Sequence, residues 1–263
     1  EKIVVLEPGK ADAYFKAAII YIKMERYEEA KKKLTVCLKM STSNPIIYDT
    51  LGLVYAKENN SEEALRYFKE SVRIARGYFA GYEHMGDVYS GQKNYEESIK
   101  KYQQAVAIQP NLAPVYLKMG MVFELQKLDE KAIKSYEKAI EIAPNMWEAM
   151  NNLAYLYAER KTNLKKAIDL IEKANKIFPE NPGMIDTLGW VYCQNKMYEK
   201  ACENLSKAAE LLPTQGVICY HLGVTYAEMG RKEDAIKTLE RAIALQLDMK
   251  YVENAMRLIE KQR

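Results

Sequence analysis

Glycine and proline are scarce in this chain, numbering 12 and 8 among 263 residues. Together with 48% apolar and 29% charged residues, that scarcity is typical of a helical protein. Apolar runs of membrane-spanning length are missing, so we expect no direct membrane insertion. An excess of charge of one sign is missing as well, because 39 basic residues against 36 acidic ones leave a net charge of +3. That balance argues against a nucleic-acid partner, which needs basic residues clustered on one face.

The sequence also lacks recognisable sets of residues that would catalyse a reaction or bind a metal. The four cysteines lack CxxC spacing, and neither His84 nor His221 has a catalytic triad or ligand set around it. There is no Walker loop and no GxGxxG motif. We therefore expect no catalytic residues, no metal site and no cofactor. Unpaired thiols favour a reducing compartment, which makes the cytoplasm the first expectation for location.

What the chain does contain is a repeat. A medium apolar residue followed by a small one returns seven times, in successive steps of 34, 34, 34, 34, 35 and 34 residues. A fixed period of this length predicts stacked helical hairpins, in which each unit contacts only its neighbours. The seven dipeptides are Ala17-Ala18, Leu51-Gly52, Met85-Gly86, Met119-Gly120, Leu153-Ala154, Leu188-Gly189 and Leu222-Gly223.

Two helical stripes appear when each unit is numbered so that this dipeptide falls at positions seven and eight. Positions four, seven, eight and eleven share one face of a first helix, because they are spaced i, i+3, i+4 and i+7. Positions 20 and 27 are small and position 24 is large, so a second helix can pack closely on the first. Each unit is then a helix A, a short turn and a helix B. Position 24 holds Leu34, Phe68, Tyr102, Tyr136, Ile171, Leu205 and Leu239.

Proline and asparagine mark the boundaries of these helices. Prolines end the B helices of units three to six, since proline cannot continue a helix. The pairs Asn44-Pro45 and Asn181-Pro182 predict an N-cap followed by proline at the first helical position. Unit five carries one extra residue in its turn near Thr162, which a surface turn tolerates.

The pattern of an aromatic residue, Leu-Gly, Tyr, then Ala, Phe or Tyr, Ala and Pro resembles the tetratricopeptide repeat. The resemblance implies an all-α fold, a right-handed superhelical solenoid of helix-turn-helix repeats closed by a C-terminal capping helix. Residues 1–10 would be the end of a truncated preceding repeat, as expected if the chain is cut from a longer protein, and residues 250–263 would form the cap. The seven units would span residues 11–44, 45–78, 79–112, 113–146, 147–181, 182–215 and 216–249.

Resemblance to the family also implies that the A helices line a concave groove, through positions two, five, six, nine, twelve and thirteen. Position nine is apolar or aromatic in six of the seven units. A contiguous apolar row of this kind indicates a contact surface, although partial burial between neighbouring A helices is the alternative. The candidate groove residues are Phe15, Ile19, Asp49, Leu53, Glu83, Asp87, Leu117, Met121, Glu124, Asn151, Asn152, Tyr155, Asp186, Trp190, Tyr220 and His221.

Acidic residues interrupt the apolar row near its middle, at Asp49, Glu83, Asp87 and Glu124. A groove that is apolar at both ends and acidic at its centre fits a protein partner, as an amphipathic helix or extended peptide that carries basic residues. Chaperone-binding relatives hold a C-terminal carboxylate with a clamp of Lys, Asn and Arg, which this chain lacks. Only Asn152 matches the asparagine ladder with which other relatives hold a peptide backbone.

The leading expectation for function is therefore a scaffold or adaptor that binds proteins. Two alternatives stay open: a structural block that self-associates through its ends as a homo-oligomer, and an array attached to a catalytic domain such as a glycosyltransferase. RNA binding is least favoured, because the groove is acidic where phosphates would pass. Units five to seven are similar to bacterial members of the family that serve the cell envelope or secretion, which makes the envelope the alternative location.

Overall fold

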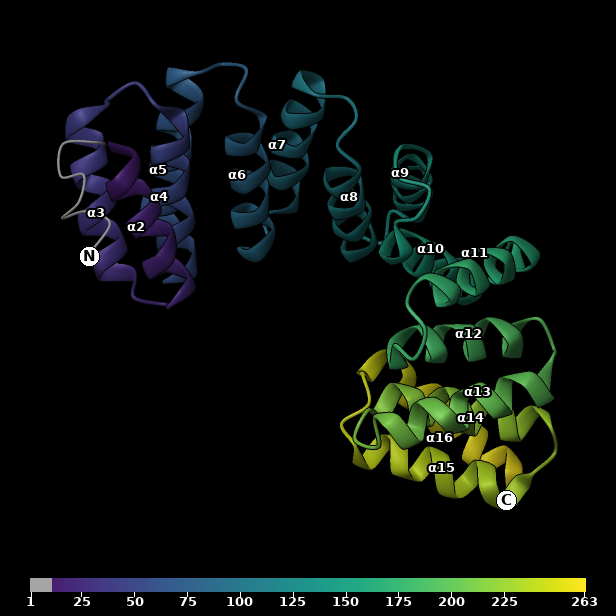
Figure 1. Ribbon diagram of the computed structural model, residues 1–263. Helices are drawn as coiled ribbons and strands as arrows, with labels where there is room; N and C mark the ends of the chain where they lie inside the picture. The colour runs from purple at the N-terminus through teal and green to yellow at the C-terminus, as the bar shows by residue number, and fades with distance from the viewer. Residues whose placement is uncertain (1–10) are drawn as a thin grey trace. The chain divides into compact units, whose positions relative to one another are not determined.

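The computed structural model describes residues 11–263, and every secondary-structure element in that part of the chain is an α-helix (Figure 1). The all-α class expected from the repeat is confirmed. The expected end of an earlier repeat, residues 1–10, lies outside the described residues. Among the helices of residues 11–263, none combines the length and the apolar character that crossing a membrane requires.

The helices alternate between the first and second members of a hairpin. The first helices begin at the residues with which the 34-residue register begins, and most are followed by a second helix of 14 residues. The elements are α2 (Ala11–Lys23), α3 (Tyr27–Met40), α4 (Pro45–Lys57), α5 (Ser61–Ile74), α6 (Phe79–Gly91), α7 (Tyr95–Ile108), α8 (Ala113–Leu125), α9 (Asp129–Ile142), α10 (Trp147–Glu159), α11 (Leu164–Ile177), α12 (Pro182–Gln194), α13 (Tyr198–Leu211), α14 (Gly216–Glu228), α15 (Lys232–Ala244) and α16 (Met249–Gln262).

The two predicted asparagine caps are confirmed. Asn44 Oδ1 accepts a hydrogen bond of 3.0 Å from the backbone N–H of Ile46. Asn181 Oδ1 accepts two, of 3.0 and 3.2 Å, from the N–H groups of Gly183 and Met184. In both helices proline follows directly, where its missing N–H would have had no intrahelical partner.

The turn inside each hairpin also recurs with the period of the sequence. One residue per turn adopts a left-handed backbone with φ between 52° and 73°, which lets the chain leave helix A and enter helix B. The extra residue of the fifth unit adds a second left-handed residue, Asn163, immediately before α11. The recurring left-handed residues are Glu25, Asn59, Lys93, Lys127, Lys161, Lys196 and Gly230.

The core of each hairpin follows the predicted B-helix stripe. Positions 20, 24 and 27 are buried in every unit; the large residue at position 24 is at most 2% exposed. Position eight is small because that large side chain lies on it. A Cβ atom on Gly52 would lie 2.5 Å from the Phe68 ring, and one on Gly86 would lie 2.4 Å from the Tyr102 ring.

The aromatic residues at position eleven are less uniformly buried than their pattern indicated. Tyr157 and Tyr192 are buried, whereas Tyr55, Tyr89 and Tyr226 are half-buried. Their rings lie at the edge of a hairpin, where polar or aromatic neighbours take the place of the core. The Tyr55 ring, for example, stacks on Tyr67 at a centroid distance of 5.3 Å.

The chain divides into two compact parts, each of which contains several repeats, one ending at Ala132 and the other beginning at Ile133. They are called the first unit and the second unit from here on. In the first unit α2 packs on α3, α4 on α5 and α6 on α7, and each of α3, α5 and α7 also packs on the helix that follows it. In the second unit the pairs are α10 with α11, α12 with α13 and α14 with α15, and α16 packs on both α14 and α15. First helices of successive hairpins also pack on one another, α4 on α6, α10 on α12 and α12 on α14, so only part of the face that they turn away from the second helices is left for other contacts.

Candidate functional site

The leftover face of α2, α4, α6 and α8 is called here the A-helix row of the first unit, and comprises positions two, five, six, nine, twelve and thirteen of each helix. Its strongly exposed apolar side chains have accessibilities between 37% and 61%, and they are Ile46, Leu53, Met121 and Leu125. The other predicted apolar contacts, Phe15, Ile19 and Leu117, are half-buried. The row thus offers apolar surface at both α4 and α8.

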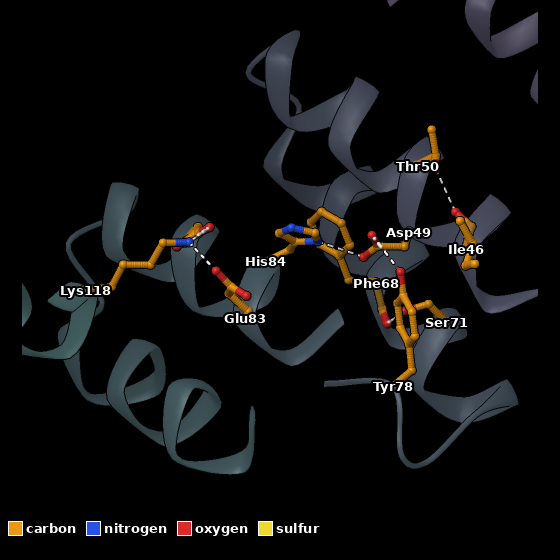
Figure 2. Close-up of polar contacts among 10 residues, drawn as sticks. Ile46, Asp49, Thr50, Phe68, Ser71, Tyr78, Glu83, His84 and Lys118 are labelled. Atoms are coloured by element: carbon orange, nitrogen blue, oxygen red, sulfur yellow. Dashed lines mark hydrogen bonds and ion pairs between the residues drawn. The ribbon is translucent and has the colours of Figure 1, made fainter. Parts of the chain in front are cut away.

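Asp49 joins α4 to the hairpin that follows. Its side chain is buried, with Oδ1 lying 2.8 Å from His84 Nδ1 and Oδ2 accepting a 3.2 Å hydrogen bond from the hydroxyl of Tyr78 (Figure 2). Burial disfavours the charged imidazole, but the hydrogen bond and negative charge of Asp49 outweigh it, so the pKa of His84 is raised above its ordinary value of 6.5. Asp49 uses both carboxylate oxygens within the unit and positions His84.

Lys118 of α8 bridges two carboxylates of α6. Its Nζ lies 2.7 Å from Glu83 Oε1 and 2.8 Å from Asp87 Oδ2, and Figure 2 shows the Lys118 side chain extending toward Glu83. The hydroxyl of Tyr102 donates to Asp87 Oδ1 at 2.7 Å. Burial lowers the pKa of Lys118, but the two carboxylates outweigh that effect and raise it, so Lys118 stays a cation. Two carboxylates around one ammonium leave a net negative charge.

A pocket of about 220 Å³ lies directly beside this cluster, between α6 and α8. Buried Tyr102 and Val122 form its inner part, and exposed Met121 and Leu125 form its rim. Asp87, Ser90 and Lys118 supply the polar side. A side chain with an apolar stem and a polar end matches this lining, since each part would meet groups of its own kind.

The same A-helix positions in the second unit are mostly covered. Asp186, Trp190, Tyr220 and His221 are each less than 9% exposed, so the surface expected at Trp190 is not open in this structure. Tyr251 of α16 packs against this region at Tyr220 and His221. Its ring stacks on Tyr220 at 4.7 Å, and its hydroxyl donates to Glu159 Oε2 of α10 at 3.0 Å.

His221 lies at the centre of this covered region. Its ring stacks on the Trp190 indole at 4.2 Å, and its Nδ1 lies 2.9 Å from Asp186 Oδ1. The pair reproduces the relation of Asp49 to His84, since the two partners are again 35 residues apart. The Trp190 indole N–H donates to Glu159 at 2.9 Å, and the hydroxyls of Tyr155 and Tyr251 lie 2.6 Å apart. His221 is therefore a packed core residue here.

The remaining predicted groove residues are less distinctive. Asn151 donates from Nδ2 to Asn152 Oδ1 at 3.3 Å, and both side chains are half-buried, as is Glu124. Sequence reasoning missed Tyr102 and Ser90 as pocket residues. It expected a capping helix over residues 250–263, but not that Tyr251 of this helix would reach Tyr155 and Glu159. Tyr102 was assigned to the hairpin core from its position in the repeat, and its hydroxyl is the signal that one end of it meets polar groups.

Comparisons with known proteins identify the same repeat. Tetratricopeptide repeat models match residues 11–44, 46–78, 78–145 and 130–182, and a model of the anaphase-promoting complex, cyclosome, subunit 3 matches residues 160–242. A TPR repeat-containing protein of Pseudomonas aeruginosa is 38% identical over 76 residues. That match spans 28% of this chain and 12% of the relative.

Solved structures of low sequence identity share the fold. The Cut9–Hcn1 hetero-tetramer of the APC/C matches 99% of this chain and 51% of that chain, with a TM-score of 0.71 and 17% identity. The match to Pseudomonas aeruginosa pilF covers 77% of this chain and 92% of pilF, with a TM-score of 0.69 and 18% identity. YrrB is described as a TPR protein with an unusual peptide-binding site. The match to it covers 68% of this chain and 92% of YrrB, with a TM-score of 0.58 and 20% identity.

Proposed function

Since this chain belongs to the tetratricopeptide repeat family, whose solenoids serve generally as protein-interaction scaffolds, we propose that the A-helix row of its first unit binds a partner protein. The ligand is an amphipathic helix or peptide in which a basic side chain stands next to apolar ones. YrrB, a TPR protein with a peptide-binding site, provides a precedent within the fold. Absence of enzymatic activity in this chain stays a prediction.

The single observation that carries the proposal is the arrangement around Lys118. Exposed Met121 and Leu125 border the pocket on α8, and Asp87 forms its acidic side on α6. Glu83 lies next to the pocket, where it is ion-paired with Lys118. Large side chains exposed at a concave, partly polar site are typical of a recognition surface, because burying them on binding removes apolar area from water.

Charge selects a basic ligand over an acidic one. Glu83 and Asp87 contribute two negative charges and Lys118 contributes one positive charge, so an arriving ammonium or guanidinium group meets a net attraction. An acidic ligand would instead compete with both carboxylates for a lysine that they already hold. The stem of a lysine or arginine would lie along Met121 and Leu125 while its charged end reaches Asp87.

The second unit supports the assignment by contrast. Its corresponding residues Trp190 and Tyr220 are buried, and Tyr251 stacks on Tyr220. Moving Tyr251 aside would break its hydrogen bonds with Glu159 and Tyr155. An incoming peptide would have to displace those contacts, whereas Leu53 and Met121 are already accessible. Binding to the first unit therefore costs less rearrangement.

A random peptide library displayed on phage tests this function. Peptides selected on the purified protein are expected to pair lysine or arginine with apolar residues at helical spacing. Met121→Asp and Glu83→Lys should each weaken the selected peptides at least about tenfold in fluorescence anisotropy, a loss of about 1.4 kcal/mol. Met24→Asp is the matched control, because Met24 is 57% exposed but lies outside the row. Selected peptides without basic residues, or equal binding by all four proteins, would contradict the proposal.

A further inference from the structure

We propose that the outer face of α16 is a two-fold interface with a second copy of this chain. The inference is independent of the peptide-binding row, because α16 belongs to the second unit. On this outer face Met249 is 80% exposed and Met256 is 54% exposed, with half-buried Val252 between them. These three side chains lie on one stripe of the helix and form part of a shallow hollow.

The opposite face of α16 is fixed to the second unit. Tyr251, Ala255 and Ile259 are buried, and Asn254 donates a 2.6 Å hydrogen bond to the Tyr220 hydroxyl. The helix is therefore held in place by one face while it presents the other. An apolar stripe exposed on a helix that is fixed by its opposite face calls for a partner.

Another hairpin of the array does not fit this face. α16 follows α15 as α14 follows α13, after a connection of the same length, so Met256 stands at position eight of α16. That position is alanine or glycine in all seven units. In the last two repeats position eight is Gly189 and Gly223. A Cβ atom there would lie 2.6 Å from Leu205 and 2.7 Å from Leu239, respectively. A methionine there holds a B helix away from the close spacing that every hairpin of this chain uses.

The charges beside the apolar stripe select a second, antiparallel copy of α16. Glu253, Arg257 and Glu260 lie on one flank of the stripe and line the same hollow. In an antiparallel helix pair related by a two-fold axis, equal flanks face each other. An axis near residue 254 then places Val252 against the partner copy's Met256 and Glu253 against its Arg257, twice by symmetry. A parallel pair would not bring this flank against itself.

The expected association is weak. A helix of 14 residues is about 21 Å long, so one pair of helices buries less than the standard size of a stable interface. We expect a dimer that forms between about 10 µM and about 1 mM protein, in the range typical of such small contacts. Two methionines suit this role because their flexible side chains adapt to an apolar partner surface.

Sedimentation equilibrium over that concentration range tests the interface. The wild-type mass should rise from one chain toward two, and Met256→Glu should keep it at one. Leu128→Glu is the matched control, because Leu128 is 39% exposed in the first unit and should leave the dimer unchanged. Circular dichroism verifies that each variant is folded, which is expected because Met256 is on the solvent side of its helix.

Charge exchange identifies the partner surface. Glu253→Arg and Arg257→Glu should each abolish self-association at moderate ionic strength, since each gives positions 253 and 257, which face each other across the two-fold axis, charges of the same sign. Mixing the two variants should restore a dimer that contains one copy of each, and the double variant should dimerise with itself. A wild-type mass of one chain at all concentrations would overturn the proposal and leave the face to a different partner. Dimerisation unaffected by Met256→Glu and by the charge changes would also overturn it.

Discussion

The ring of Phe68 lies so close to Gly52 that a Cβ atom on the glycine would be 2.5 Å from ring carbon Cε1. Phe68 is fully buried, so the ring has no free space into which to move. The same relation joins Gly86 to Tyr102, and Gly189 and Gly223 to the leucines of their hairpins. The small residue at position eight is thus the place where helix B rests on helix A.

Gly52→Ala should therefore destabilise the first unit by about 1–3 kcal/mol, because the added methyl group overpacks the contact with Phe68. Gly91→Ala is the control, since a Cβ atom there would have no neighbour within 4 Å apart from the adjoining residues and the backbone of its own helix. In the control the better helix propensity of alanine should leave stability unchanged or slightly raised. Urea denaturation followed by circular dichroism separates the two, and an equal effect of both substitutions would contradict the packing.

Truncating the large residue of this contact, Phe68, should lower the free energy of unfolding more than enlarging the small one, Gly52. Phe68→Ala removes a ring that is 0% exposed and should lower the free energy of unfolding by about 3–5 kcal/mol. Tyr89→Ala should cost clearly less, because Tyr89 is only half-buried at the edge of its hairpin. Chemical denaturation of both variants tests whether Phe68→Ala loses more stability than Tyr89→Ala. A larger loss at Tyr89 than at Phe68 would show that exposure does not set the cost here.

These contacts show why the sequence predicts the hairpins so well. Position 24 must be large and position eight small in every unit, so seven repetitions of one local contact determine the register from Gly52 to Gly223. Helix starts such as Asn44-Pro45 are likewise local, since the Asn44 side chain and the Ile46 N–H that donates to it lie two residues apart. A repeat array is predictable because nearly all of its contacts join neighbours.

The candidate site was less predictable because it depends on contacts between distant residues. Tyr251 meets Tyr155 across 96 positions of the chain, and no period of the sequence relates them. Position nine therefore looked alike at Leu53 and Trp190, although the first is 37% exposed and the second 5%. The partnership of Asp49 with His84 and of Asp186 with His221 was also not predicted, because only two of the seven repeats have an aspartate at position five and a histidine at position six of the next repeat.

The pair of His84 and Asp49 makes the stability of the first unit depend on pH. Because the pKa of His84 is raised in the folded state, its contribution is fully present below the ordinary value of 6.5 and is lost as pH rises through the folded pKa. The free energy of unfolding of wild type minus that of Asp49→Asn should thus decrease from acidic to alkaline pH across this window. NMR titration of the His84 ring gives the folded pKa directly, and a value below 6.5 would contradict the assignment.

The Tyr251 hydroxyl should stabilise the second unit through its two polar contacts. Tyr251→Phe keeps the ring stacked on Tyr220 but leaves Glu159 Oε2 and the Tyr155 hydroxyl without this partner. Losing hydrogen bonds to partly buried groups, one of them a carboxylate, should cost about 1–3 kcal/mol. Hydrogen exchange should show faster opening of α16 and of the α10 segment around Glu159, because Tyr251 joins them.

Tyr116→Phe serves as the control for that substitution. Tyr116 is half-buried on α8, and its hydroxyl has no hydrogen bond in the part of the chain that the structure describes, so its removal should change stability little. If both substitutions have equal effects, the loss is a general property of removing a tyrosine hydroxyl and Tyr251 has no special role. If Tyr251→Phe alone loosens α16 and α10 together, the Tyr251 hydroxyl is the group that holds these two helices against each other in the second unit.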